Sequence, residues 1–184
     1  SRRQRQMCIR DRLIVALAMF LAVGYELKVA RYDFKGQSVD KNVSMQDFDG
    51  FFKVVYFGYM FCPDVCPTTL AMVSSALEEL DVKDVKILFF TIDLERDDIK
   101  SCDEFAKYFY QNALCIRVND ENKLKKMVKN YGAKYEISKA NNEYIVAHSP
   151  FIYLLDEKGR FIKEVTNLTY ENLKNELAQL KRAK

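Results

Sequence analysis

The stretch FFKVVYFGYMFCPDVCPTTL, residues 51–70, predicts a strand, a loop with two cysteines and a helix in immediate succession. Phe51–Tyr59 is an apolar run typical of a buried strand, and Pro67–Leu80 has the pattern of an amphipathic helix. Cys62 and Cys66 lie between them, where the unpaired N–H groups at a helix start lower the pKa of a nearby thiol. Their spacing is one residue longer than the Cys-x-x-Cys of thioredoxin-like redox enzymes, which moves the second thiol further into the helix. Two thiols so placed can form a disulfide or bind a metal.

The chain has a single histidine, His148, far downstream of the two cysteines. With its imidazole, the thiols would form a site of two sulfur atoms and one nitrogen, and soft thiolates favour copper or zinc over hard cations. A structural histidine with a satisfied ring is the alternative interpretation. The sequence therefore predicts Cys62, Cys66 and His148 as metal ligands, with Cys62 and Cys66 also a candidate redox pair.

The charge of the chain argues against nucleic acid as a partner. The formal net charge is +3, but residues 1–12 alone contribute +4 and the remaining 172 residues sum to −1. No basic surface is therefore predicted for the domain. At 184 residues with 49% hydrophobic content, the chain is long enough to bury one sizeable core.

The first 25 residues are interpreted apart from the domain. The segment MCIRDR, residues 7–12, resembles the translation of a transposase adapter used to prepare sequencing libraries, so residues 1–12 are interpreted as an artefact. A genuine basic region ahead of a signal or anchor is the alternative. Residues 13–25 (LIVALAMFLAVGY) carry no charge, and we expect a membrane anchor or the remnant of a signal peptide. They are fewer than the roughly 20 apolar residues of a spanning helix, and a buried core helix is the alternative.

Residues 29–184 alternate strands and helices with short connections, which predicts one α/β domain. Strands are predicted at Val29–Phe34, Phe51–Tyr59, Val85–Ile92, Leu114–Val118, Tyr135–Ile137, Tyr144–Val146, Phe151–Leu155 and Phe161–Val165. Helices are predicted at Pro67–Leu80, Ile99–Tyr110, Glu121–Tyr131 and Tyr170–Leu180. Cys102 and Cys115 occupy apolar positions and are interpreted as small core residues, with a disulfide between them left open.

Three segments resemble the Sco/SenC family of copper chaperones. Residues 57–67 (FGYMFCPDVCP) resemble the family's cysteine signature, and residues 148–161 (HSPFIYLLDEKGRF) its metal-ligand histidine, strand and turn. Residues 91–97 (TIDLERD) resemble the family's Asp-Pro-Glu-Arg-Asp stretch, with Leu94 at the usual proline. Met60 replaces the usual threonine, and two cysteines are additional, but no ligand is lost. On their residue types alone, Asp93, Arg96 and Asp97 are interpreted as a surface charge cluster, and only the resemblance implies that they support the metal ligands.

The resemblance implies a thioredoxin-like fold, a central mixed sheet flanked by helices, together with a membrane tether. It also implies delivery of copper to the dinuclear site of cytochrome c oxidase subunit II. We therefore expect a copper metallochaperone rather than an enzyme, which binds Cu(I) or Cu(II) through Cys62, Cys66 and His148. Its expected partners are subunit II and another periplasmic copper carrier or a thiol reductant. Its expected location is the inner membrane of a bacterium, with the domain facing the periplasm.

Two enzymatic functions remain as alternatives. The first is a thiol–disulfide oxidoreductase that reduces the cysteines of the receiving copper site, with Cys62 as the attacking thiolate. The second is a peroxide-reducing enzyme of the thioredoxin superfamily, which needs one reactive cysteine and no histidine ligand. Loss of His148 separates them from a chaperone, because a metal site requires this side chain and thiol exchange does not.

Overall fold

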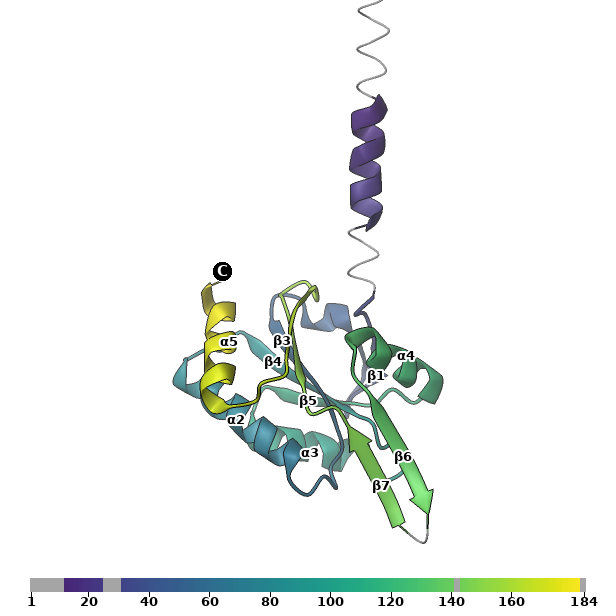
Figure 1. Cartoon of the computed structure of the whole chain (residues 1–184), viewed down its shortest axis with the longest axis vertical. Coiled ribbons are helices and arrows are strands. Elements are labelled where there is room, and N and C mark those ends of the chain that lie inside the picture. The colour runs from purple at the N-terminus through teal and green to yellow at the C-terminus, as the bar shows by residue number, and fades with distance from the viewer. Residues whose placement is uncertain (1–11, 25–30, 141–142, 183–184) are drawn as a thin grey trace, which may run out of the picture. The chain divides into compact units, whose positions relative to one another are not determined.

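The structure is a computed structural model that describes residues 12–24, 31–140 and 143–182 (Figure 1). The chain divides into two compact units, Ser1–Arg31 and Tyr32–Lys184.

In the first unit, residues 12–24 form a helix with exposed side chains, which covers most of the anchor predicted at residues 13–25. No helix among the described residues is both long enough and apolar enough to span a membrane. The artefact predicted at residues 1–12 falls outside the described residues, except for residue 12.

A five-stranded mixed sheet forms the centre of the second unit, with the strand order β5-β4-β3-β8-β9. Its central strand β3 (Phe52–Gly58) pairs parallel with β4 (Val85–Thr91), which pairs parallel with β5 (Ala113–Ile116). On its other side β3 pairs antiparallel with β8 (Ile152–Leu155), which pairs antiparallel with β9 (Phe161–Val165). All seven residues of β3 are buried, Lys53 included, because the strand lies in the middle of a sheet that is covered on both faces.

Helices cover both faces of this sheet, because successive side chains of a strand point to opposite faces. The ring of Tyr56 packs on the ring of Phe89 at 5.9 Å between centroids, and Phe89 packs on Phe105 of the helix α3 (Ile99–Phe109) at 5.7 Å. The next residue, Phe57, packs instead on Tyr131 of the helix α4 (Glu121–Tyr131) at 5.3 Å. The helices are α2 (Val65–Glu79), α3 (Ile99–Phe109), α4 (Glu121–Tyr131) and α5 (Tyr170–Arg182), and α2 packs against both α3 and α5 (Figure 1). The predicted α/β architecture, a central mixed sheet flanked by helices, is confirmed.

Two small hairpins accompany the sheet. The first consists of β1 (Lys35–Gln37) and β2 (Asn42–Ser44), and a 3-10 helix, η1 (Met45–Phe48), follows it. The second consists of β6 (Tyr135–Ala140) and β7 (Glu143–His148), which extends away from the sheet in Figure 1.

The strand predicted at Val29–Phe34 is wrong for its described residues, since residues 31–34 form no strand and pairing begins at Lys35. Phe34 is buried by ring contacts with Phe48 and Phe90, at 6.1 and 4.9 Å, rather than by strand pairing. An apolar pattern reports burial, and here burial comes from a loop.

Cys102 of α3 and Cys115 of β5 form a disulfide, with 5.6 Å between their Cα atoms. Both side chains are fully buried, as the interpretation as core residues requires, and the disulfide that the sequence left open is present. The bond ties a helix to the strand that follows it. Disulfides of this kind form and persist in oxidising compartments.

Candidate metal centre

The structure brings Cys62, Cys66 and His148 together at one end of β3. Their two Sγ atoms and a ring nitrogen all lie within 4.8 Å of one another. Cys66 is buried, whereas Cys62 and His148 are half-buried, so solvent reaches the cluster at Cys62 and at His148. Both cysteines are free thiols.

The two thiols come from a loop and a helix start. Cys62 belongs to the segment between β3 and α2, residues 59–64, which we call the cysteine loop, and Cys66 is the second residue of α2. The helix starts two residues before the predicted Pro67. The N–H of Cys66 points at Sγ of Cys62, 3.4 Å away. The second thiol therefore lies inside the first helical turn and the first thiol lies at its N-terminal end.

This arrangement separates the acidities of the thiols. Burial raises the pKa of the Cys62 thiol, but N–H groups at the helix start outweigh this effect, and the pKa lies below its ordinary value. These donors are the backbone N–H groups of Cys66, Asp64 and Val65. For Cys66, burial dominates and raises the thiol pKa to about 12. The pKa lowering expected at a helix start thus holds for Cys62 alone.

His148 is the last residue of β7, and its ring is held in one tautomer. Nδ1 lies 3.0 Å from the carbonyl oxygen of Ser149, and because a carbonyl only accepts, Nδ1 carries the proton. Nε2 is then free to accept, and it lies 3.5 Å from Sγ of Cys66. Burial lowers the pKa of the imidazole, which favours the neutral form that binds metals.

Two tyrosines that the sequence analysis did not single out as site residues pack against this ring. The ring of Tyr59 meets that of His148 edge-on at 5.7 Å between centroids, and the ring of Tyr56 does so at 6.2 Å. The hydroxyl of Tyr59 also donates to the carbonyl oxygen of Val146 at 3.3 Å. The cysteine loop and β7 are thereby joined directly. In the sequence, the one sign of this role is that Tyr59 stands three residues before Cys62.

The charge cluster predicted at the surface is largely buried, which corrects that interpretation. Asp93 is fully buried and Asp97 is 2% exposed. Oδ2 of Asp97 accepts the N–H of Met60 at 3.1 Å, so this carboxylate holds the backbone of the cysteine loop. Burial raises the pKa of Asp97 above its ordinary value. The segment at residues 91–97 thus supports the cysteine loop, which carries the proposed ligand Cys62.

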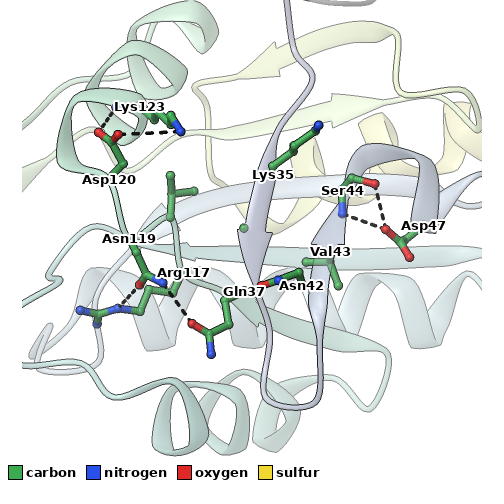
Figure 2. Close-up of a pocket in the computed structure, with 12 residues that line it drawn as sticks. Lys35, Gln37, Asn42, Val43, Ser44, Asp47, Arg117, Asn119, Asp120 and Lys123 are labelled. Carbon is green, nitrogen blue, oxygen red and sulfur yellow. Dashed lines mark hydrogen bonds and ion pairs between the residues drawn. The ribbon is translucent and has the colours of Figure 1, made fainter.

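Figure 2 shows a different hollow, of about 510 Å³, which none of the three ligand candidates lines. It lies between the hairpin β1–β2, the end of β5 and the start of α4. Its polar side chains pair with one another, as in Ser44–Asp47, Arg117–Asn119 and Asp120–Lys123. Because these groups satisfy each other, we assign no binding role to this hollow.

The donor set of the cluster fits a soft metal ion. Two thiolates and a neutral imidazole carry a charge of −2, so Cu(I) leaves the site at −1 and Cu(II) leaves it neutral. Cu(I) is satisfied by three soft ligands, whereas Cu(II) prefers a fourth. The cluster can thus accommodate copper in either oxidation state, and its thiols can also pair as a disulfide.

Comparisons with known proteins agree with this assignment. A family model described as SCO1/SenC matches residues 26–183. An SCO2-like protein of Rickettsia typhi is 32% identical over 123 residues, which cover 62% of this chain and 58% of that protein. The mitochondrial protein SCO2 of Saccharomyces cerevisiae is 34% identical over 136 residues, which cover 71% of this chain and 44% of that protein. The chain thus spans about half the length of these curated relatives.

Among solved structures, the copper-bound ScoI of Arabidopsis thaliana has the same fold. It superposes with a TM-score of 0.74 at 25% sequence identity, covering 83% of this chain and 98% of the other.

Proposed function

The chain belongs to the SCO1/SenC family, and from this premise we propose that it is a copper chaperone that binds one copper ion through Cys62, Cys66 and His148. The observation that carries the proposal is the meeting of two thiols and one neutral imidazole within 4.8 Å. Copper bound to a relative of the same fold favours copper over zinc. The role is that of a carrier, which takes up the ion and hands it on.

The unequal exposure of the three ligands suits transfer. Cys66 is buried, whereas Cys62 is half-buried and the pKa of its thiol lies below the ordinary value. A thiolate of a receiving protein can therefore approach copper from the side of Cys62 and exchange with one ligand at a time. No ligand would have to leave the protein interior before the new bond forms.

We further propose that the receiving protein is subunit II of cytochrome c oxidase, whose dinuclear copper site the family resemblance implies. The domain would work on the periplasmic side of a bacterial inner membrane. Its further partner would be another copper carrier, which supplies the ion, or a thiol reductant, which keeps Cys62 and Cys66 reduced. The Cys102–Cys115 disulfide supports an oxidising compartment. The uncharged segment at residues 13–25 supports a membrane tether.

A thiol–disulfide oxidoreductase is the second candidate, and one observation favours it. The half-exposed thiol of Cys62 has a lowered pKa while the thiol of Cys66 is buried behind it, as in dithiol enzymes that attack with the first cysteine. Such an enzyme would reduce the cysteines of the receiving copper site and would be oxidised to the Cys62–Cys66 disulfide. Neither it nor a peroxide-reducing enzyme gives a role to the imidazole of His148.

Metal analysis of the full chain in its two redox forms tests the proposal. We expect about one copper per reduced chain and essentially none when Cys62 and Cys66 form a disulfide, because that bond removes both thiolate ligands. The Cys102–Cys115 disulfide serves as an internal control, since it must remain intact in both samples. Equal copper binding by the two forms would contradict the proposed site.

A further inference from the structure

Arg96, in the segment between β4 and α3, lies against three aromatic rings. Its guanidinium carbon is 4.0 Å from the ring centroid of Tyr144, 5.1 Å from that of Phe61 and 5.7 Å from that of Tyr59. Tyr59 and Phe61 belong to the cysteine loop, whereas Tyr144 belongs to β7, the strand that ends at the histidine. One cation therefore contacts both segments that carry the proposed ligands.

An ion pair holds Arg96 in this place. Nε of Arg96 donates to Oδ2 of Asp93 at 2.5 Å, and the hydroxyl of Tyr144 donates to Oδ1 of the same carboxylate at 2.8 Å. Asp93 is fully buried and the side chain of Arg96 is 29% exposed. Both charges are thus largely removed from water. Contacts between a cation and aromatic rings are strongest when the cation is shielded from solvent in this way.

The same segment also holds the cysteine loop through its backbone. Asp97 accepts the N–H of Met60 at 3.1 Å, and Thr91 donates its hydroxyl to the same carboxylate oxygen at 2.6 Å. This contact fixes the loop to the end of β4 but does not reach β7. The hydrogen bond from Tyr59 to Val146 joins the cysteine loop to β7 directly, and the Asp93–Arg96 pair with Tyr144 joins the two segments at a second place, through the segment between β4 and α3.

We propose that Arg96 is a positioning residue that sets the separation between the cysteine loop and β7, and so the geometry of the Cys62–Cys66–His148 site. The inference rests on the proposed copper-binding function of that site. Cu(I) tolerates varied arrangements of soft ligands, whereas Cu(II) depends more strongly on nitrogen coordination and geometry. The effect of Arg96 should therefore be greatest on the Cu(II) form.

Substitution of Arg96 in the full chain tests this role. Arg96→Met keeps most of the aliphatic volume and removes the cation. We expect one Cu(I) per chain to bind still, but Cu(II) to bind about ten- to a hundredfold more weakly, the usual effect of removing a group that orients a metal ligand. The thiolate-to-Cu(II) absorption should shift. Arg96→Lys keeps the charge but loses the planar stacking and the Nε donor, so a smaller effect in the same direction is expected.

Lys139→Met is the matched control. Nζ of Lys139 lies 5.2 Å from the ring centroid of the same Tyr144, but its side chain is 57% exposed and pairs with Glu95 instead. We expect this variant to bind Cu(II) as the wild type does and to show the same absorption. A Cu(II) affinity of Arg96→Met equal to that of the wild type overturns the inference.

A measurement on the metal-free protein separates this inference from the copper function. In amide 15N relaxation spectra, Arg96→Met should broaden signals from both residues 59–62 and residues 144–148, and Lys139→Met should leave both sets sharp. If the wild type binds no copper, the proposed function fails, and these spectra still decide the role of Arg96. Sharp signals in Arg96→Met, or broadening confined to one of the two segments, overturn the positioning role of Arg96. If Arg96→Met does not fold, Arg96→Lys carries the same comparison.

Discussion

A Cβ atom on Gly58 would lie 2.9 Å from Sγ of Cys66 and 2.8 Å from the ring of Phe89. Gly58 is the last residue of β3, and its missing side chain lets the buried thiol of α2 rest directly on the strand. A heavy-atom separation below 3.0 Å requires one of the neighbours to move. The position of the deepest proposed ligand therefore depends on a glycine in the central strand.

Gly58→Ala should both destabilise the fold and disturb copper binding. Overpacking of a dense core costs about 1–3 kcal/mol, and the added methyl group displaces Sγ of Cys66. Urea unfolding and competition titration with Cu(I) measure the two effects. The double variant Gly58→Ala/Phe89→Leu relieves only the contact with the ring. Its loss of unfolding free energy should therefore be smaller than the sum of the losses in the two single variants, while its copper affinity stays reduced. Wild-type Cu(I) affinity in a folded Gly58→Ala would show that the close approach is unimportant.

His148→Ala should distinguish the chaperone from the oxidoreductase. The imidazole provides one of three proposed bonds to copper, and no other histidine exists in the chain to replace it. Cu(II) affinity should collapse first, because two thiolates alone can still hold Cu(I). We expect the thiolate-to-Cu(II) absorption to disappear while the Cys62–Cys66 disulfide still forms and breaks at a similar rate, since exchange depends on thiolate fraction and access. A wild-type Cu(II) spectrum would remove His148 from the site and favour the oxidoreductase.

The sequence predicted best those elements whose signals are local. The bounds of α4, Glu121–Tyr131, are as predicted, because the side chain of Asp120 accepts the N–H of Lys123 at its start and Gly132 ends it in the left-handed region, at φ 82°. The lysines of this helix at positions 123, 125, 126 and 129 are exposed, as expected of a solvated face.

Features that depend on contacts between distant segments could not be predicted. The pairing of Cys102 with Cys115 depends on α3 lying on β5, and an apolar pattern is the same for a paired and an unpaired buried cysteine. His148 lies 82 residues from Cys66 in the sequence. Its meeting with the two thiols was suggested only by the ligand preferences of soft metals and by the family resemblance. The contact between Arg96 and Tyr144 could not be predicted from the sequence, because both are residue types that are common on protein surfaces and only the fold brings them together.

Replacement of both Cys102 and Cys115 by Ala should lower the free energy of unfolding by about 3 kcal/mol, the size expected for a disulfide between cysteines 13 residues apart in the sequence. Copper stoichiometry should not change, because neither sulfur belongs to the proposed site. Urea midpoints of the wild type and the double variant, each with and without reductant, measure the effect. A reductant should lower the wild-type midpoint and leave that of the variant unchanged. Coincident midpoints for the two proteins would mean that the bond contributes nothing to stability.

Lys53 is the most deeply buried cation that the described residues include. Its side chain is fully covered, and Nζ donates to the carbonyl oxygens of Asp156 and Glu157 at 3.1 and 2.7 Å. Burial lowers its pKa from 10.5 to about 8, although the nearby carboxylates of Asp49, Asp156 and Glu157 partly oppose this shift. The charged form is therefore less favourable in the folded chain than in the unfolded chain.

The sign of the pH dependence follows from this lowered pKa. Below pH 8 Lys53 is charged in both states, and the folded state bears the cost of burying the charge. Between pH 8 and 10.5 the folded chain loses the proton while the unfolded chain keeps it, so stability rises with pH, by up to about 3 kcal/mol from this group. Chemical unfolding from pH 7 to 10.5 measures this as the difference between wild type and Lys53→Met, which cancels the other groups. A difference that stays constant between pH 7 and 10.5 would mean that the buried ammonium of Lys53 does not destabilise the fold.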